Sequence, residues 1–458
     1  MTEADRYPRV LVVGQAFDRS TGGGITLSNL FEGWPRDRLA NVVPPAVPIA
    51  RDVCDRFYSL GTSEIGWVWP LSLVRRTDTP PSGALERSAV ASSQALAGGA
   101  ARDTHGVARE LLRASVGALG ALDVLRSMRP SKALLEWIRG FGPDVIYSQL
   151  GDLPIIELVR GLVAETGSPF ALHVMDDWPE SKYREGALAP LARARMRRGL
   201  HALVEDAGVL LAISERMASE YAERYGRPFT AVHNPVDLDR WDADAAAHPR
   251  SREAEGEGTL VLVYAGRIGN ANVSSLRDVA EAVGRLSSSG EPLQLHVYTN
   301  DIGAPAVAAL AACPGVIVRP GVEYAQVPGL LAASDALLLP LDFDERALRF
   351  ARLSMPTKVS EYLAAGRPVL TYAPRESAVA QYAREGAWSL VVDERDPSLV
   401  EGALRRLLSE PALRTAMGAH GRRLAAERHD AGRVRARFAE ELAKAGRSGR
   451  GGSANGAI

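Results

Sequence analysis

Short apolar runs that alternate with helical stretches are the feature of this sequence that most restricts its fold. The first run, residues 9–14, is mostly Val and Leu and ends in Gly, which is typical of a strand buried on both faces. A helical pattern of apolar residues follows it over residues 25–31. Similar apolar runs occur at residues 144–147, 170–174, 209–213 and 229–232. Strands that alternate with helices predict a parallel, doubly wound sheet.

The same pattern begins again in the second half of the chain. Residues 260–266 form another apolar run that ends in Gly. Further runs follow at residues 293–299, 316–319, 336–340, 368–372 and 389–392. We therefore predict an α/β protein with two Rossmann-like domains that face a central cleft. Sheets of this kind bind ligands at the carboxyl ends of their strands.

Shifts in composition mark the predicted domain boundaries. Pro, Ala, Ser and Gly dominate residues 80–106, which we expect to be flexible or weakly helical. Acidic and Ala residues dominate residues 241–258, and this composition is typical of an interdomain linker. The predicted segments, in chain order, are an N-terminal domain at 1–240 with an insertion at about 76–130, a linker at 241–258, a C-terminal domain at 259–425, a helix at 426–446 and a disordered tail at 447–458.

Composition and charge exclude several classes of function. The chain has 458 residues, with 54 Lys and Arg against 55 Asp and Glu, so it lacks the strongly basic balance of a nucleic-acid-binding domain. Its two Cys residues fit no zinc spacing. The N-terminus has no apolar signal-peptide core, and no run approaches 18 apolar residues. We expect a cytoplasmic protein without a nucleic-acid partner.

Residues 355–370, with the sequence MPTKVSEYLAAGRPVL, carry the strongest chemical signal. Pro356 suits a helix start, where the free N–H groups of Thr357 and Lys358 would form an anion site. The Lys358 ammonium adds a point charge suited to a phosphate. Glu361 falls on the same helical face and could accept hydrogen bonds from two vicinal hydroxyl groups of a ribose. The alternative is an ordinary Lys–Glu pair on an amphipathic helix.

This segment resembles the donor-site signature of the GT-B retaining glycosyltransferases, group 1 or family 4-like, which include bacterial enzymes of cell-surface polysaccharides. The resemblance covers roughly residues 9–35 and 144–430. It implies the GT-B architecture and a hexosyltransferase that moves a sugar, with retention, from a nucleotide-sugar donor to a hydroxyl group of a glycan, lipid-linked or small-molecule acceptor. It also implies that Glu361 holds the ribose and that neither a metal ion nor another cofactor is required.

Four other landmarks match the family pattern. The resemblance implies that Arg267, which follows the run 260–266, contacts the donor diphosphate. It implies that a first loop at Gly22, Gly23 and Gly24 approaches the donor phosphate and the acceptor, although a glycine triplet is as often a plain turn. It further implies that His173 lies beside the transferred sugar and that Val322 lies in a loop contacting the nucleotide base.

His173 precedes two carboxylates and an indole in a single loop. Asp176 or Asp177 could hydrogen-bond to hydroxyl groups of the sugar or acceptor, and Trp178 could stack on a pyranose face or simply pack. The two Asp residues also suit a metal ion, but no further ligand lies at helical ligand spacing. We therefore expect no metal site. A lone His at a strand end also fits a structural role.

The chain departs from the family pattern at two positions. Asn272 stands where the family usually has a second phosphate-binding Lys, and we hypothesise that Lys358 replaces that charge. Leu353 stands where the family has the first of two Glu residues, the one that contacts the transferred sugar. Either the hydroxyl pattern of the sugar differs, or nearby acids hold it. Those candidate acids are Asp342, Asp344 and Glu345, for which a solvated loop is an equal alternative.

A run of four Arg residues with interleaved apolar residues predicts a basic helix at about residues 191–200. Its Arg residues are Arg193, Arg195, Arg197 and Arg198. Such a helix is either a solvated face or a surface that contacts anionic lipid, which would place the protein peripherally at the inner membrane face.

Two other functions compete with sugar transfer. A sugar-nucleotide epimerase can share this two-domain architecture, and His173, Asp176 and Asp177 would then have to supply its acid and base groups. A non-catalytic sugar-nucleotide-binding partner subunit is the other alternative, because Asn272 and Leu353 replace two functional residues of the family.

Overall fold

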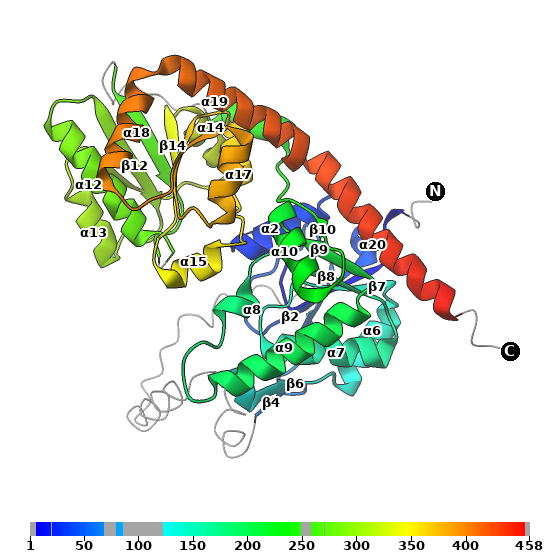
Figure 1. Ribbon diagram of the computed structural model, residues 1–458. Helices are drawn as coiled ribbons and strands as arrows, with labels where there is room; N and C mark the ends of the chain where they lie inside the picture. The colour runs from blue at the N-terminus through cyan, green and yellow to red at the C-terminus, as the bar shows by residue number, and fades with distance from the viewer. Residues whose placement is uncertain are drawn as a thin grey trace. The chain divides into compact units, whose positions relative to one another are not determined.

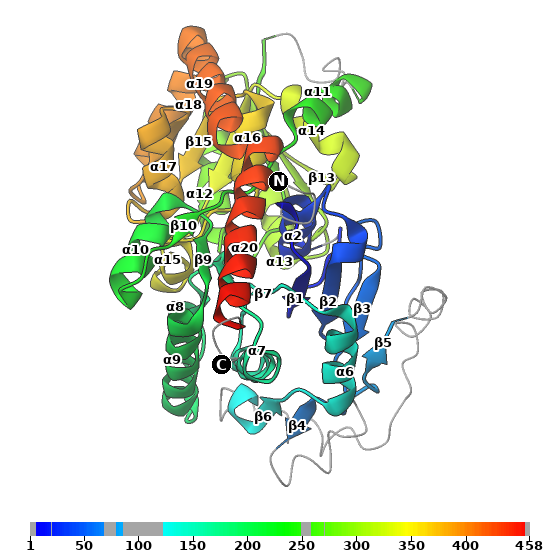
Figure 2. The ribbon, with the colours of Figure 1, turned by 90° about the vertical axis from the view of Figure 1, so that its right-hand side faces the viewer.

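The computed structural model describes residues 6–19, 21–67, 79–85, 122–248, 258–269 and 271–453. The chain forms two compact units. The first unit comprises Met1–Val232 and Arg435–Ile458, and the second comprises His233–Val434. Each unit is an α/β structure built on one main sheet (Figures 1 and 2). No helix among the described residues is both long enough and apolar enough to cross a lipid bilayer.

The sheet of the first unit has eight strands in the order β10-β9-β8-β7-β1-β2-β3-β5. All neighbouring strands are parallel except β3 and β5, which are antiparallel. The strands are β1 (Val10–Val13), β2 (Leu39–Val43), β3 (Arg56–Ser59), β5 (Gly83–Ala84), β7 (Val145–Ser148), β8 (Phe170–Val174), β9 (Val209–Ala212) and β10 (Thr230–Ala231). The predicted parallel sheet is confirmed, since burial on both faces makes its central strands continuous apolar runs.

Strand β2 was not predicted, because the polar Asn41 interrupts its apolar run. The structure buries Asn41 completely and satisfies its side chain. The side-chain amide accepts a hydrogen bond from Phe17 N at 3.1 Å and donates to the carbonyl oxygens of Val12 and Gln15 at 3.2 and 2.9 Å. A fully hydrogen-bonded amide is tolerated in a core, so this interruption does not end the strand.

Helices cover both faces of this sheet, and many begin at a side-chain cap. Ser131, Asp152 and Ser214 each accept a hydrogen bond from a backbone N–H in the first turn of the following helix. The helices of the first unit are α2 (Gly22–Phe31), α6 (Lys132–Phe141), α7 (Leu153–Thr166), α8 (Trp178–Ser181), α9 (Ala189–Asp206), α10 (Glu215–Tyr225) and most of α20 (Ala431–Ser453). Phe438 of α20 packs edge-on against Phe31 and Tyr147, which anchors this C-terminal helix to the first unit.

The predicted insertion is ordered in the parts that the structure describes. Strand β5, within the stretch predicted to be flexible, adds to the edge of the main sheet. Strands β4 (Ile65–Trp67) and β6 (Arg126–Met128) form a separate antiparallel ribbon. The buried Glu64 carboxylate ties these segments together, because it accepts hydrogen bonds from Ser82 and Ser131. The remaining residues of the insertion, 76–78 and 86–121, lie outside the described chain.

The second unit contains a six-stranded parallel sheet in the order β13-β12-β11-β14-β15-β16. Its strands are β11 (Leu260–Ala265), β12 (Leu293–Thr299), β13 (Val316–Pro320), β14 (Ala336–Pro340), β15 (Val369–Tyr372) and β16 (Ser389–Val392), close to the predicted runs. Its helices are α11 (Leu238–Ala247), α12 (Val273–Ser288), α13 (Pro305–Ala311), α14 (Val327–Ala332), α15 (Glu345–Ala351), α16 (Lys358–Ala365), α17 (Ala378–Gly386), α18 (Pro397–Ser409) and α19 (Pro411–Leu424). The strand order reverses between β11 and β14, which makes their carboxyl ends the expected ligand site.

The structure of two segments differs from the prediction. Helix α11 occupies the start of the predicted linker at 241–258, and it packs against α14, so this stretch belongs to the second unit. Residues 249–257 of that linker lie outside the described chain. Helix α20 continues to Ser453, through most of the tail predicted to be disordered from residue 447, and residues 454–458 are not described. Composition alone misses both helices, because Ala and Arg are good helix formers that also occur in linkers, and because Gly and Ser in the tail favour a loop by their own preferences.

Candidate functional site

Lys358 reaches from the start of α16 to the end of β11 in the second unit. Its Nζ donates a hydrogen bond to the carbonyl oxygen of Ala265 at 3.2 Å and lies 4.3 Å from the centre of the Tyr264 ring. Gly266 makes this approach possible, because its φ is +147° and a Cβ atom there would lie 2.7 Å from Nζ. The ammonium group is therefore held at the switch point of the sheet.

The Asn272 side chain also contacts Tyr264. Its side-chain amide donates to the Tyr264 hydroxyl group at 2.8 Å and to the Arg267 carbonyl oxygen at 3.1 Å. Lys358 and Asn272 thus contact opposite parts of one side chain, the ring and the hydroxyl group of Tyr264. The Arg267 side chain is exposed beside them and forms no hydrogen bond or ion pair with the described residues. This geometry supports the hypothesis that Lys358 supplies the cation missing at Asn272.

The surroundings keep Lys358 protonated. Burial acts to lower its pKa, but Tyr264, Tyr362 and Glu361 together raise the pKa above its ordinary value. Thr357, the residue before α16, is exposed. The N–H group of Val359 donates to the Pro356 carbonyl oxygen at 3.0 Å, whereas the N–H groups of Thr357 and Lys358 have no acceptor within the helix. A cation and free N–H groups at one helix start suit the binding of a phosphate group.

Glu361 lies one turn further along α16 and is partly buried. Burial raises the pKa of its carboxyl group, whereas a hydrogen bond from Tyr324 and the charge of Lys358 oppose that rise. Tyr324 belongs to the short helix η5 (Tyr324–Gln326), which follows the loop containing Val322. The Tyr324 contact therefore connects the helix of the phosphate-suited site to that loop.

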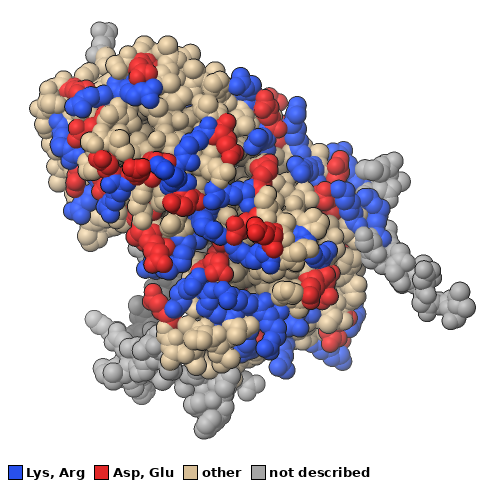
Figure 3. Space-filling model, in the orientation of Figure 1, with Lys and Arg blue, Asp and Glu red and all other residues tan. Residues whose placement is uncertain are grey.

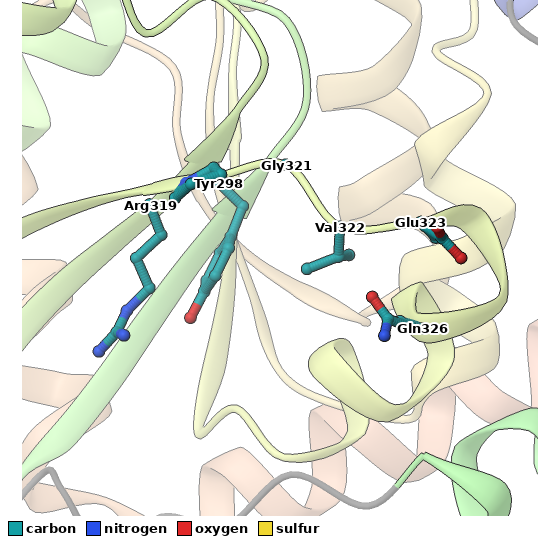
Figure 4. Close-up of a pocket in the computed structure, with 7 residues that line it drawn as sticks. Tyr298, Arg319, Gly321, Val322, Glu323 and Gln326 are labelled. Atoms are coloured by element: carbon teal, nitrogen blue, oxygen red, sulfur yellow. The ribbon is translucent and has the colours of Figure 1, made fainter.

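A pocket of about 490 Å³ opens at the carboxyl ends of β12 and β13, beside the Val322 loop (Figure 4). Its lining residues are Tyr298, Arg319, Pro320, Gly321, Val322, Glu323 and Gln326. The structure thus arranges the predicted residues of the second unit along one edge of its sheet. One part of this edge carries Arg267, Thr357 and Lys358. Glu361 lies one turn beyond Lys358 on α16, and Val322 lines the pocket.

The glycine triplet is not a loop, as the sequence suggested, but the first turn of α2. Thr21 caps this helix by accepting a hydrogen bond from Gly24 N at 3.1 Å. A Cβ atom on Gly24 would lie 1.8 Å from a carboxylate oxygen of Asp18, so this glycine is required for packing. Gly22 and Gly23 are exposed, and their backbone remains open to a ligand.

His173, at the carboxyl end of β8, is completely buried. Its Nδ1 lies 2.9 Å from the Tyr147 hydroxyl group, and its ring packs against Phe438. Burial lowers the pKa of His173 to about 3, so the imidazole is neutral at physiological pH. These contacts match the structural role that the sequence left as the alternative, and the His173 side chain is fully buried in this unit.

Asp177 is also buried, and its carboxylate is already engaged. It accepts hydrogen bonds from Arg224 Nη1 and from the Tyr221 hydroxyl group, both at 2.9 Å. These partners belong to α10, so Asp177 fastens the loop after β8 to that helix. Asp176 is partly exposed, while Trp178 is buried at the start of α8. Of the two carboxylates, Asp176 alone remains accessible to a ligand.

The three acids proposed to replace the missing Glu have local structural partners. Asp342 is buried and accepts hydrogen bonds from Ser275 N at 2.7 Å and Ser274 N at 3.2 Å, at the start of α12. Asp344 caps α15, and Glu345 pairs with Arg349 at 3.3 Å. Leu353 is fully buried in the core. Within the described ranges, no group of three or more His, Cys, Asp or Glu side chains could hold a metal ion.

Comparison with known families agrees with this geometry. Residues 259–410 match the model of the group 1 glycosyl transferases, and residues 97–240 match that of Glycosyltransferase Family 4. This chain is a group 1 glycosyltransferase. No curated protein sequence matches the chain significantly.

Solved structures show that this glycosyltransferase has the GT-B fold. Anabaena HepE in complex with UDP and glucose has a TM-score of 0.58 at 12% identity, over 95% of this chain and 99% of HepE. Sucrose-phosphate synthase from Thermosynechococcus elongatus has a TM-score of 0.61 at 13% identity, over 94% and 98%. WaaG, a glycosyltransferase involved in lipopolysaccharide biosynthesis, has a TM-score of 0.54 at 14% identity, over 94% and 98%.

Proposed function

We propose that this group 1 glycosyltransferase transfers a hexose from a nucleoside diphosphate sugar to a hydroxyl group of a glycan, lipid-linked or small-molecule acceptor, with retention. The observation that carries the proposal is the position of Lys358 over the end of β11, beside Arg267 and one turn before Glu361. The structure of HepE with UDP and glucose supports a donor of this class. We assign the diphosphate to Arg267, Lys358 and Thr357, the ribose to Glu361 and the base to the Val322 pocket.

The chemistry requires charge stabilisation rather than a protein nucleophile. The acceptor oxygen forms a bond to the anomeric carbon while the bond from that carbon to the diphosphate breaks, and the electron pair leaves with the diphosphate. The acceptor proton passes to a donor phosphate oxygen on the same face, which retains the configuration. Arg267 and Lys358 would stabilise the charge that develops on the leaving diphosphate, and such preorganised groups usually make the largest contribution.

The first unit would supply the acceptor side. Gly22 and Gly23 offer exposed backbone at the start of α2, and Asp176 offers a partly exposed carboxylate. His173 would support this region from within the core, without touching the sugar. The proposal includes transfer without a metal ion, in the cytoplasm of a bacterium, within the synthesis of a cell-surface polysaccharide or glycoconjugate. WaaG, a lipopolysaccharide enzyme of the same fold, supports this setting.

Nucleotide binding tests the donor site directly. We expect one of UDP, GDP, dTDP or ADP, or its sugar, to raise the melting temperature of the protein, and EDTA to leave this rise unchanged. Glu361→Ala should weaken binding of that nucleotide about tenfold or more, because the ribose hydroxyl groups lose a charged acceptor. Glu136→Ala, an exposed acid on α6 of the first unit, is the control. If no nucleotide stabilises the protein, the partner-subunit alternative and the transferase are both excluded.

A basic surface on α9 supports contact with an anionic membrane (Figure 3). Arg184, Arg193 and Arg197 all donate to the single carboxylate of Glu180, at 2.7, 3.2 and 3.2 Å, so the cluster keeps a net positive charge. Leu191 is 51% exposed beside it. The apolar face with Met196 and Leu200 is buried, so this helix offers charge rather than an amphipathic face for insertion.

Sedimentation with vesicles of anionic and neutral composition tests this contact. We expect binding to anionic vesicles alone. Arg197→Ala with Arg198→Ala should weaken it about 30-fold, since each cation near such a surface contributes about 1 kcal/mol. The control pair is Arg405→Ala with Arg406→Ala on α18 of the second unit. Equal binding by the two double variants would remove the membrane from the proposal.

A further inference from the structure

Arg319 lines the pocket beside Val322 and is the next-to-last residue of β13. The strand register places it directly opposite Tyr298 of β12. Figure 4 shows the two side chains extending side by side from neighbouring strands, with Val322 and Gln326 across from them. The pocket therefore has one wall that carries a guanidinium group and another formed by the loop after β13.

The guanidinium group of Arg319 has no protein partner in the described part of the chain. Its Nε is buried without a hydrogen bond, and the side chain forms no ion pair. Several other arginines of this unit are paired, such as Arg395 with Asp278 at 2.8 Å and Arg375 with Asp393 at 3.1 Å. The rest of the side chain is partly exposed, so its donors remain open to an acceptor on a ligand that enters the pocket.

The position of the pocket indicates which part of a ligand would reach Arg319. The loop that forms the pocket continues into Tyr324, which contacts Glu361 on α16. If Glu361 holds the ribose, as the proposed function states, the base extends into this pocket. The polar edge of the base then meets a side chain that can donate hydrogen bonds but cannot accept them.

We propose that Arg319 selects donors whose base carries a carbonyl oxygen at C4 of a pyrimidine or at C6 of a purine. Uracil, thymine and guanine present such an oxygen, whereas cytosine and adenine present an amino group, which is a donor. A guanidinium group facing an amino group leaves both unsatisfied. This inference rests on the proposed function and adds the class of base to it.

Two matched pairs of nucleotides test this edge of the base. UDP and CDP differ at C4 and in the adjacent N3–H, and IDP and ADP differ at C6 and in the adjacent N1–H, so within each pair only this edge changes and the dissociation constants can be compared by calorimetry. We expect the wild-type protein to bind the carbonyl member of at least one pair about 10- to 100-fold more tightly. In Arg319→Met this ratio should fall to about one, mainly through weaker binding of the carbonyl nucleotide. Arg277→Met, on the exposed face of α12, should keep the wild-type ratio.

A ratio of two constants does not depend on the folded fraction, so a destabilised variant still gives an answer. Arg319→Lys keeps a donor and should retain part of the preference. Equal binding within both wild-type pairs, or an unchanged ratio in Arg319→Met, would overturn the role of Arg319 while leaving the donor site intact. If none of these four nucleotides binds and neither GDP nor dTDP stabilises the protein, the proposed function itself fails.

Discussion

Lys358→Met is expected to lower kcat/KM for sugar transfer by about 10²- to 10³-fold, which is the usual effect of removing one group that stabilises a developing oxyanion. Met retains the length and apolar stem of Lys but removes the ammonium group that contacts Ala265 and the Tyr264 ring. Most of the loss should appear in kcat, because charge on the diphosphate grows in the transition state. Initial rates with a radiolabelled donor measure both constants.

A second substitution distinguishes a lost charge from a disturbed helix. In the Lys358→Met background, Asn272→Lys places an ammonium group on the other side of Tyr264, where the family usually carries it. We expect kcat/KM of this double variant to be at least tenfold higher than that of Lys358→Met. Lys444→Met, an exposed residue of α20, should retain wild-type activity. Full activity of Lys358→Met would contradict the assignment, and a failed rescue would show that the position of the cation matters as well as its charge.

Asp177→Asn is expected to lower the free energy of unfolding of the first unit by about 2–3 kcal/mol. The substitution leaves Arg224 and Tyr221 facing a neutral amide, and breaking a buried charge pair by changing one partner typically costs 3–5 kcal/mol. We expect a smaller loss, of about 2–3 kcal/mol, because the Arg224 side chain is 22% exposed and water partly screens its charge. Calorimetry should show a fall in melting temperature of about 5–10 °C.

The neighbouring residue provides the matched control. Asp176→Asn changes the same group one position earlier, in a partly exposed site, and should change the melting temperature little while it raises KM for the acceptor. For Asp177→Asn we expect unchanged kinetic constants per folded molecule. A normal melting temperature together with a raised KM would show that Asp177 binds the substrate, as the sequence alone suggested.

Residue patterns close together in the sequence predicted much of the second unit. The runs that became β11 to β16, and the segment that became α16, depend on burial and capping within a few residues of each other. Lys358 and Glu361 are one turn apart on a single helix, so their common face follows from helical geometry. Helical geometry does not predict the connection from Glu361 through Tyr324 to the Val322 pocket, because that connection depends on how two separate segments pack.

The first unit shows where sequence patterns are insufficient. His173, Asp176 and Asp177 lie close together in the sequence at the end of β8, which suggests a common role in binding. The tertiary structure separates them, because Arg224 and Tyr221 of α10 take the Asp177 carboxylate and Phe438 of α20 covers the His173 ring. Nothing within the loop indicates which polar residue another part of the chain will bury.

The sequence by itself determined the alternation of strands and helices, the presence of two sheets and the charged face of α16, because each depends on residues that are neighbours in the chain. The tertiary structure alone decided which charged groups remain available to a ligand. It paired Asp177, Asp342 and Asp344 with protein partners and left the Arg319 guanidinium without one among the described residues. Burial and pairing depend on segments far apart in sequence, and these determine whether a polar side chain supports the fold or binds a ligand.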